Sequence, residues 1–247
     1  MQFSFATLIG AAAVIFASPF ARIEPRTVAS LDPAATAQAQ QRDNTATRAV
    51  SNAQIKTSSG QCLFVDPLSG DFRENLAPIQ VGDCGKQGTG WDVITKGKHI
   101  DVAADPDANG SALIASTLTN ACFNFDPRKA PGLQVFLFSC GGRADGDSTT
   151  TSSQLFAFDG KTNSIQFSPA NARANANGQE ASCFTVKGNV VDIAQCNAAD
   201  PNQTFSFGGD GASTPAGSIA ATTASASAIA TPTDAADGQS GNSGCQA

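Results

Sequence analysis

The chain of 247 residues contains the same short pattern three times. Each copy has a strand-like run that opens on cysteine, a loop, a second strand that closes on cysteine, and an aromatic strand. The copies run from Gln61 to Ile94, from Ala121 to Phe158 and from Ser182 to Phe207. Such self-similarity indicates one repeated supersecondary unit, and units of this size bury a core only by packing on one another. The repeat therefore constrains the fold more than any single residue does.

Six of the 7 cysteines lie in pairs within the copies. Six cysteines allow fifteen connectivities, and only the repeat symmetry selects one bond within each copy. The paired cysteines are 22, 18 and 13 residues apart. Disulfides that close loops of this length stabilise a fold by roughly 3 kcal/mol each. The alternative is a set of buried reduced thiols. The predicted disulfides join Cys62 with Cys84, Cys122 with Cys140, and Cys183 with Cys196.

Each copy offers four β-like stretches, separated by clusters of Gly, Pro, Asn and Asp. In the first copy these stretches are QIKTS, CLFVD, PIQVGDC and WDVITKG. No helical period longer than two turns interrupts the pattern, which predicts an all-β class built from three units of four strands. Aromatic residues recur at matching places in the fourth stretches, where we expect them to form the core. These residues are Trp91, Phe156, Phe158, Phe205 and Phe207.

The N-terminal residues indicate export. Phe5 to Ala17 is an apolar run that ends in small residues, which is typical of a signal peptide spanning residues 1–17 and is too short to cross a membrane. Residues 18–50 have no sustained apolar period and are interpreted as a propeptide or linker. N-glycosylation sequons at Asn109 and Asn202 fit an exported glycoprotein. We therefore expect a secreted protein, extracellular or associated with a cell wall.

The C-terminal residues 209–247 are rich in Ser, Thr and Ala, with no Lys, Arg or aromatic residue. This composition cannot bury a core and predicts a disordered, O-glycosylated tail. Cys245 near its end either pairs between chains, giving a disulfide-linked dimer, or stays a free thiol. What remains is one folded domain, residues 51–208, of ordinary size for a single core.

The three copies resemble the ricin B-type lectins, the carbohydrate-binding module family 13. The resemblance rests on a repeated Cys-x-x-Val-like strand, a second cysteine and a closing Gln-x-Trp-like motif. The CLFVDP and CFNFDP strands are similar to those of secreted fungal members. The closing motif stands here as Gln154-Leu155-Phe156, Gln203-Thr204-Phe205 and, in degraded form, Thr89-Gly90-Trp91. The resemblance implies a lectin-like β-trefoil with repeats at residues 51–112, 113–170 and 171–208.

Galactose-binding repeats of that family carry an Asp two residues after the first cysteine, an aromatic residue two before the second, and an Asn before the closing motif. The carboxylate and the amide hold two hydroxyls while the ring stacks on the apolar face of the sugar. In this chain only the second repeat retains a ring and an amide. The matching residues are Phe64, Gly82 and Gly88 in the first repeat, Asn124, Phe138 and Ser153 in the second, and Thr185, Ala194 and Asn202 in the third.

Two further carboxylates could replace the missing one from a shifted position. Asp66 and Asp126 each stand four residues after a first cysteine and directly before a proline. The alternative is that each Asp-Pro pair only starts a turn. Phe138 also has an alternative place in the core, because both sides of its strand are apolar. The implied carbohydrate-binding set is Asn124, Asp126, Phe138, Gln154 and Asp66.

Catalytic, metal and nucleic-acid functions find little support in the sequence. His99 is the only histidine, and we interpret it as a solvated residue of the turn-like KGKHID segment. Asp105 to Gly110 imitates the start of a calcium loop, but position twelve is Ser116 instead of Glu, and a strand follows instead of a helix. A net charge of -6 disfavours binding to nucleic acid. We expect no enzymatic activity, no metal and no cofactor.

The predicted function is non-catalytic, weak binding of glycans or cell-wall polysaccharide, mainly by the second repeat. One alternative is a β-trefoil that binds a protein partner, as protease inhibitors do, through long loops such as Gly141 to Ser153. Another is a structural protein of the cell wall. The single Trp and the absence of Tyr leave few rings of the kind that stack on sugars, so the sequence keeps all three open.

Overall fold

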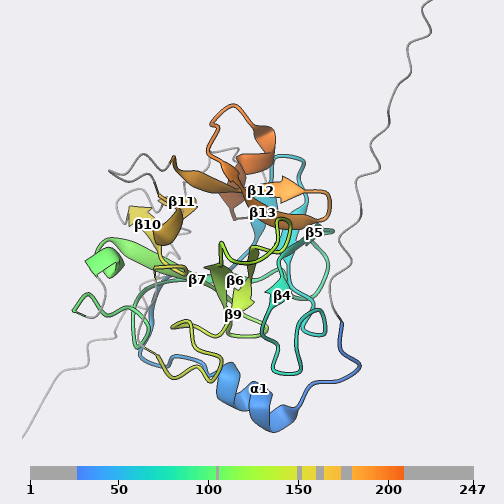
Figure 1. The fold of residues 1–247 in the computed structure, drawn as a ribbon, viewed down its shortest axis with the longest axis vertical. Helices are drawn as coiled ribbons and strands as arrows, with labels where there is room; N and C mark the ends of the chain where they lie inside the picture. Colours follow the sequence, from blue (N-terminus) through green and yellow to red (C-terminus); the bar gives the residue numbers. More distant parts are fainter. Residues whose placement is uncertain (1–26, 104–105, 149–151, 160–163, 174–179, 209–247) are drawn as a thin grey trace, which may run out of the picture.

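A computed structural model describes residues 27–103, 106–148, 152–159, 164–173 and 180–208 (Figure 1). The expected signal peptide, the Ser/Thr-rich tail and Cys245 lie outside these residues. The first repeat contains β1 (Thr47–Ala53), β2 (Ile55–Thr57), β3 (Cys62–Phe64), β5 (Gln80–Gly82) and β6 (Trp91–Lys96). The second contains β7 (Ser111–Ser116), β8 (Cys122–Phe125), β9 (Val135–Phe138) and β10 (Phe156–Asp159). The third contains β11 (Ser164–Pro169), β12 (Ser182–Lys187), β13 (Val190–Gln195) and β14 (Phe205–Phe207).

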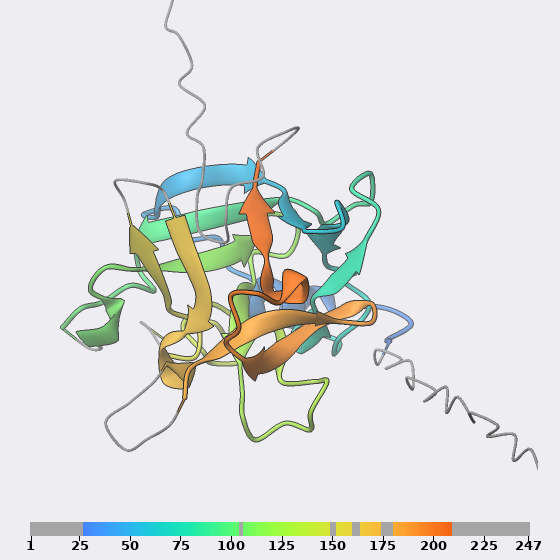
Figure 2. The ribbon, with the colours of Figure 1, turned by 90° about the horizontal axis from the view of Figure 1, so that it is seen from above.

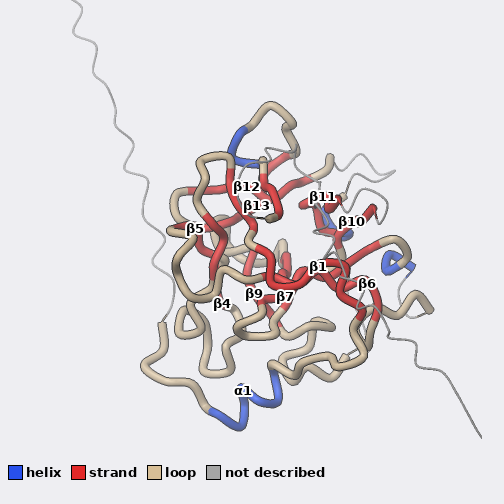
Figure 3. The backbone as a smooth tube through the Cα atoms, turned by 180° about the vertical axis from the view of Figure 1, so that it is seen from behind, coloured by secondary structure: helices blue, strands red, loops and turns tan. Residues whose placement is uncertain are grey.

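Short elements connect these strands or precede them. The helix α1 lies at the end of the molecule opposite β12 and β13 (Figures 1 and 3). Asp32 caps this helix, because its carboxylate accepts hydrogen bonds from the amides of Ala34 and Ala35, and a proline opens the first turn. The short elements are α1 (Pro33–Ala39), β4 (Ala77–Pro78) and the 3-10 helices η1 (Pro106–Ala108), η2 (Ala170–Ala172) and η3 (Pro201–Gln203).

The strands pair in a three-fold pattern. The two middle strands of each repeat form an antiparallel hairpin: β3 with β5, β8 with β9, and β12 with β13. The last strand of each repeat pairs with the first strand of the next: β6 with β7, β10 with β11, and β14 with β2. Figure 2 shows β14, in orange, running up to the blue strands of the first repeat. A ring of first and last strands with one hairpin per repeat is the predicted β-trefoil.

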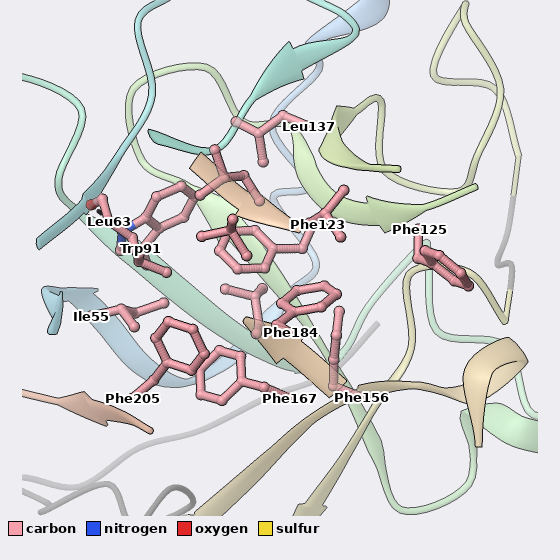
Figure 4. Close-up of a cluster of buried hydrophobic side chains, with 14 of the residues drawn as sticks. Ile55, Leu63, Trp91, Phe123, Phe125, Leu137, Phe156, Phe167, Phe184 and Phe205 are labelled. Carbon is pink, nitrogen blue, oxygen red and sulfur yellow. Dashed lines mark hydrogen bonds between the residues drawn. The ribbon is translucent and has the colours of Figure 1, made fainter. Parts of the chain in front are cut away.

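Equivalent residues of the three repeats build the core (Figure 4). One position follows the first cysteine, and another begins the fourth strand. All six side chains at these positions are fully buried. The rings of Trp91 and Phe123 meet edge to face with centroids 4.7 Å apart, and those of Phe156 and Phe184 with centroids 5.4 Å apart. The six residues are Leu63, Phe123 and Phe184 after the cysteines, and Trp91, Phe156 and Phe205 in the fourth strands.

The predicted pairing of the six cysteines is present in the described part of the chain. The Cα atoms of Cys62 and Cys84 are 4.8 Å apart, those of Cys122 and Cys140 5.0 Å, and those of Cys183 and Cys196 4.8 Å. Each bond ties the second strand of a repeat to the residues that follow its third strand. Since such bonds persist in oxidising compartments, they fit an extracellular protein. None of the helices described is long and apolar enough to cross a membrane.

The folded unit begins earlier than residue 51. The amide of Val28 donates to the carbonyl of Leu68, and that of Asp32 donates to the carbonyl of Phe72, both at 2.9 Å. The buried side chain of Gln40 donates to the carbonyls of residues 73 and 74. In addition, β1 starts at Thr47 and pairs with β6. Residues 27–50, part of the segment interpreted as a propeptide or linker, are therefore packed on the domain.

The repeat boundaries also differ from those expected. The first strand of the second repeat starts at Ser111 and that of the third at Ser164, whereas the sequence placed these boundaries at residues 113 and 171. The closing strand of one repeat and the opening strand of the next form a hairpin across the boundary. The cysteine pattern does not mark that turn, so it does not locate the boundary between two repeats.

Candidate functional site

The three middle hairpins have the same register, which fixes the equivalent positions. The first cysteine of each repeat faces Gly82, Phe138 or Ala194 across the hairpin. The residue two positions further along the strand is Phe64, Asn124 or Thr185. These are the residues matched from the sequence, so the comparison between repeats holds in three dimensions.

A pocket of about 490 Å³ lies on the second repeat. This volume is in the range of small-molecule sites. Phe136 and Phe138 contribute rings at right angles, with centroids 6.2 Å apart, and Phe138 is the more exposed of the two. Of the five residues predicted to bind sugar, Asn124, Asp126 and Phe138 line this pocket, whereas Gln154 and Asp66 do not. The other lining residues are Leu76, Phe125, Pro127, Arg128, Lys129, Phe136, Gly142, Ser152, Ser153 and Asn171.

Asn124 is held in place by a neighbouring hydroxyl. Its side-chain oxygen accepts a hydrogen bond of 2.9 Å from the hydroxyl of Ser153. Both residues belong to the set that was matched to the galactose-binding repeats from the sequence. Asn124 is 6% exposed, and no hydrogen bond of its Nδ2 is formed with the described residues. Because the amide oxygen is used, Asn124 offers the pocket mainly a donor.

Asp126 is engaged locally and is not the free acceptor that the sequence suggested. Its Oδ1 accepts from the backbone amide of Arg128 at 3.0 Å and from Nε of the same residue at 2.8 Å, and its Oδ2 accepts from the guanidinium at 3.0 Å. The Asp126 side chain is 15% exposed and that of Arg128 is 88% exposed. The guanidinium hydrogen bonds hold the pKa of the Asp126 carboxyl below its ordinary value. The Asp-Pro turn, offered as the alternative, is therefore what the structure contains.

Asp66 makes the equivalent turn in the first repeat. Its Oδ1 accepts from the amide of Leu68 at 2.9 Å, and its carbonyl accepts from the hydroxyl of Ser69 at 2.6 Å. The residue is exposed and lies on a different repeat from the pocket. Asp66 therefore forms the Asp-Pro turn that was the alternative for it, and it lies apart from the pocket that Asp126 lines.

Gln154 is structural in this protein. It is fully buried, its Oε1 accepts from the amide of Gly141 at 2.8 Å, and its Nε2 donates to the carbonyl of Ser139 at 3.1 Å. Gln203 of the third repeat makes the same two bonds, to the amide of Asn197 and the carbonyl of Gln195. Each glutamine thus clamps the backbone on both sides of a disulfide cysteine. Its assignment as a sugar ligand is corrected accordingly.

The equivalent position in the first repeat is closed by a ring. Phe64 is 7% exposed, and a Cβ atom placed on Gly82 would lie 3.0 Å from its Cε1. Lys86 also lies over this ring, with Nζ 4.4 Å from the ring centroid. Phe64 therefore occupies the space in which the second repeat presents Asn124 and Phe138.

In the third repeat, a loop of the second repeat covers the equivalent position. Asp192, which faces Thr185 across the hairpin, is fully buried. Its Oδ2 accepts from the amide of Gly132 at 2.7 Å and from Nζ of Lys187 at 2.9 Å. Since Gly132 belongs to the loop between β8 and β9, that loop lies on the third hairpin.

His99 is not solvated, contrary to the expectation from its turn-like sequence. The residue is 4% exposed, and its Nδ1 lies 2.7 Å from the carbonyl oxygen of Ser148 in the long loop of the second repeat. Burial lowers the pKa of His99, although the contact with the carbonyl acts in the opposite direction. Its place is structural: it joins the turn after β6 to a loop distant in the sequence.

The remaining predicted sites lie at the surface. Asn109 and Asn202 of the two sequons are exposed, so both are accessible to a glycosyltransferase. The part of the DPDANG segment that the structure describes contains η1, as expected for a turn. Within the described ranges, no group of three or more His, Cys, Asp and Glu side chains is placed to hold a metal ion.

Two cations at the pocket were not among the residues predicted from the sequence. Arg128 and Lys129 follow Asp126-Pro127 directly and are exposed at its rim. Lys129 lies with Nζ 5.8 Å from the ring centroid of Phe136. The sequence feature that could have indicated them is their position directly after the Asp-Pro turn, because turn residues lie at the surface.

A scan against models of known protein families finds no match, and neither does a search of curated proteins. Among solved structures, a GlcNAcα1-4Gal-releasing endo-β-galactosidase from Clostridium perfringens is similar with a TM-score of 0.42 and 10% identity over 64% of this chain and 32% of its own. The designed three-fold symmetric protein ThreeFoil has a TM-score of 0.42 and 12% identity over 64% of this chain and 97% of its own. Cry35Ab1 has a TM-score of 0.41 and 11% identity over 73% and 38%. This chain thus spans about a third of the galactosidase, and the fold assignment rests on the strand pairing alone.

Proposed function

We propose that this protein is a secreted, lectin-like β-trefoil that binds a saccharide in the second-repeat pocket without cleaving it. The observation that carries the proposal is the meeting of a partly exposed ring, Phe138, with the amide of Asn124 in one pocket. A saccharide presents both an apolar face of C–H groups and a set of hydroxyls, so it is recognised by a ring and fixed by a few hydrogen bonds. The resemblance to fungal ricin B-type lectins supports the same assignment.

The absence of catalysis is part of the proposal. Among the described residues that line the pocket, Asp126 is the one carboxylic acid, and Arg128 already holds it. Hydrolysis of a glycosidic bond usually needs two carboxyl groups, one as acid and one as base or nucleophile. The protein is therefore proposed to act by binding alone, in an extracellular or cell-wall setting that its three disulfides suit.

Binding to one solvent-open sugar is expected to be weak, in the millimolar range that corresponds to roughly 4 kcal/mol. The test is a glycan array with the full secreted chain, followed by titration of the best ligand. Phe138→Ala should abolish the binding. Phe72→Ala is the matched control, because Phe72 is a phenylalanine 49% exposed that does not line the pocket.

Two results would overturn the proposal. One is unchanged saccharide binding in the Phe138→Ala variant. The other is an array on which the parent protein binds no fungal, plant or animal glycan. In the second case the long loop after Cys140 becomes the surface to test, by assaying protease inhibition before and after its deletion.

A further inference from the structure

The second-repeat pocket is richer in donors than in acceptors. Both carboxylate oxygens of Asp126 receive hydrogen bonds from Arg128, and the side-chain oxygen of Asn124 is used by Ser153. Asn171 also lines the pocket, and its Nδ2 donates to the carbonyl of Phe125 at 3.3 Å. The donors left toward a ligand are the Nδ2 of Asn124, the outer N–H groups of Arg128 and the ammonium group of Lys129, whereas the side-chain oxygen of Asn171 is the amide acceptor that remains. A ligand that fits them must bring acceptors.

The charge of the pocket also favours a ligand that carries hydrogen-bond acceptors. Its described lining residues include two cations, Arg128 and Lys129, and one carboxylate, Asp126. The ion pair between Asp126 and Arg128 cancels one positive charge, with Nε and Oδ1 2.8 Å apart. The charge of Lys129 remains, and no ion pair joins it to a carboxylate in the described part of the chain. This positive rim stands out on a chain with a net charge of -6.

We infer that the saccharide taken by this pocket is acidic, a hexuronate whose carboxylate pairs with Lys129 and the outer edge of Arg128 while its ring lies against Phe138. The inference rests on the proposed function and narrows it to a substrate class. A carboxylate supplies acceptors for the donors of Asn124, Arg128 and Lys129, and a charge-assisted hydrogen bond is stronger than a neutral one. A neutral hexose would leave the ammonium group of Lys129 without an anionic partner.

The experiment is a titration of the ¹⁵N-labelled full chain with galacturonate and, separately, with galactose, which differs from it only at C6. Galacturonate should bind about five times more tightly or better at low ionic strength, with shifts in the amides of β8, β9 and the loop between them. Raising the salt from about 0.01 M to about 0.15 M should reduce this advantage, since the pair is exposed and screened.

Lys129→Gln should weaken galacturonate binding about two- to fivefold, the effect of one exposed ion pair, and leave galactose binding unchanged. Lys86→Gln is the matched control: Lys86 is also an exposed lysine over a phenylalanine, in the first repeat. Asp126→Asn should strengthen galacturonate binding, because it removes the only negative charge from the pocket lining that the structure describes. If Asp126 instead held a sugar hydroxyl directly, the same variant would lose binding.

Three outcomes separate the inference from the proposed function. Equal or tighter binding of galactose at the second repeat overturns the acidic class and leaves saccharide binding intact. Shifts caused by galacturonate that map only to other parts of the chain overturn the site. No response to either sugar, together with a blank glycan array, overturns both.

Discussion

The middle hairpins of the first and second repeats share the same strand register and expose different side chains. Both place a disulfide at the same register, and in both an Asp-Pro turn follows the first strand. In the first, Phe64 folds over Gly82 and closes the surface. In the second, Asn124 stands beside Phe138 and the surface opens into a pocket. Two positions per hairpin therefore distinguish the repeat with a pocket from the repeat without one.

This difference shows that fold and site are carried by opposite faces of one hairpin. The inner face holds Leu63 or Phe123, which are fully buried in both repeats. The outer face holds the residues that vary. Side chains alternate between the two faces along a strand, so a change on the outer face leaves the core untouched. We therefore expect substitutions on the inner face to lower the free energy of unfolding by large and similar amounts in both repeats. Substitutions on the outer face should instead change ligand binding in their own repeat.

The largest expected effect comes from the inner face of the second hairpin. Phe123→Ala should lower the free energy of unfolding by about 3–5 kcal/mol, because a ring at the centre of the aromatic core leaves a cavity. Phe138→Ala on the outer face of the same hairpin should lower it by about 1 kcal/mol or less while removing saccharide binding. Urea denaturation measures both. A larger loss from Phe138→Ala would place that ring in the core instead.

The disulfides should come next, with similar effects in the repeats compared. Replacing Cys122 and Cys140 together by Ser should cost roughly 3 kcal/mol, and the same change at Cys62 and Cys84 should cost nearly the same, since the closed loops differ only from 18 to 22 residues. Thermal unfolding of the two double variants tests this. A clearly unequal loss of stability in the two double variants would mean that the two disulfides do not stabilise their hairpins to the same extent.

A smaller effect concerns the contact that links the first repeat to the second. His99 is buried with its pKa lowered, mainly by desolvation, while Lys98 lowers and Asp43 raises it. The unfolded chain therefore binds a proton more readily, and the free energy of unfolding should fall as the pH drops below about 6.5. Glu74 acts in the opposite sense: burial raises its pKa to about 6, so its contribution is lost as the pH rises through that value.

The variants His99→Gln and Glu74→Gln separate these two contributions to the pH dependence of the free energy of unfolding. The first should remove the loss of stability below about pH 6.5, and the second should remove the loss above about pH 4.5. Chemical denaturation at several pH values provides the measurement. An unchanged pH profile in His99→Gln would show that the imidazole is solvated after all.

The sequence predicted the fold well because the repeats encode it redundantly. The cysteine pairs, Trp91 and Phe156 recur at equivalent places, and each copy supports the interpretation of the others. The sequence also indicated which residues share the second-repeat pocket: the hairpin register places Asn124 opposite Phe136 and Cys122 opposite Phe138, so Asn124 and Phe138 lie diagonally on one face of the hairpin. A repeated local pattern of this kind can be recognised in the sequence without knowledge of the tertiary structure.

The errors arise from contacts that the sequence does not mark. His99 is buried by a loop that contacts it through Ser148, 49 positions away in the sequence. Residues 27–50 are fixed by backbone hydrogen bonds, such as that from Val28 to Leu68, which require no particular side chain. Asp126 is engaged by Arg128 through a side-chain geometry that spacing alone does not determine. Strands can be predicted from local sequence patterns, whereas contacts made by loops depend on how the whole chain folds.

The most direct measurement converts the second hairpin into a copy of the first. The double variant Asn124→Phe/Phe138→Gly should place a ring over a glycine, as Phe64 lies over Gly82, and close the pocket. Titration with the saccharide that binds the parent chain should then give no response, while the free energy of unfolding changes by about 1 kcal/mol or less. Saccharide binding that persists in a folded double variant would contradict the placement of the site in the second repeat.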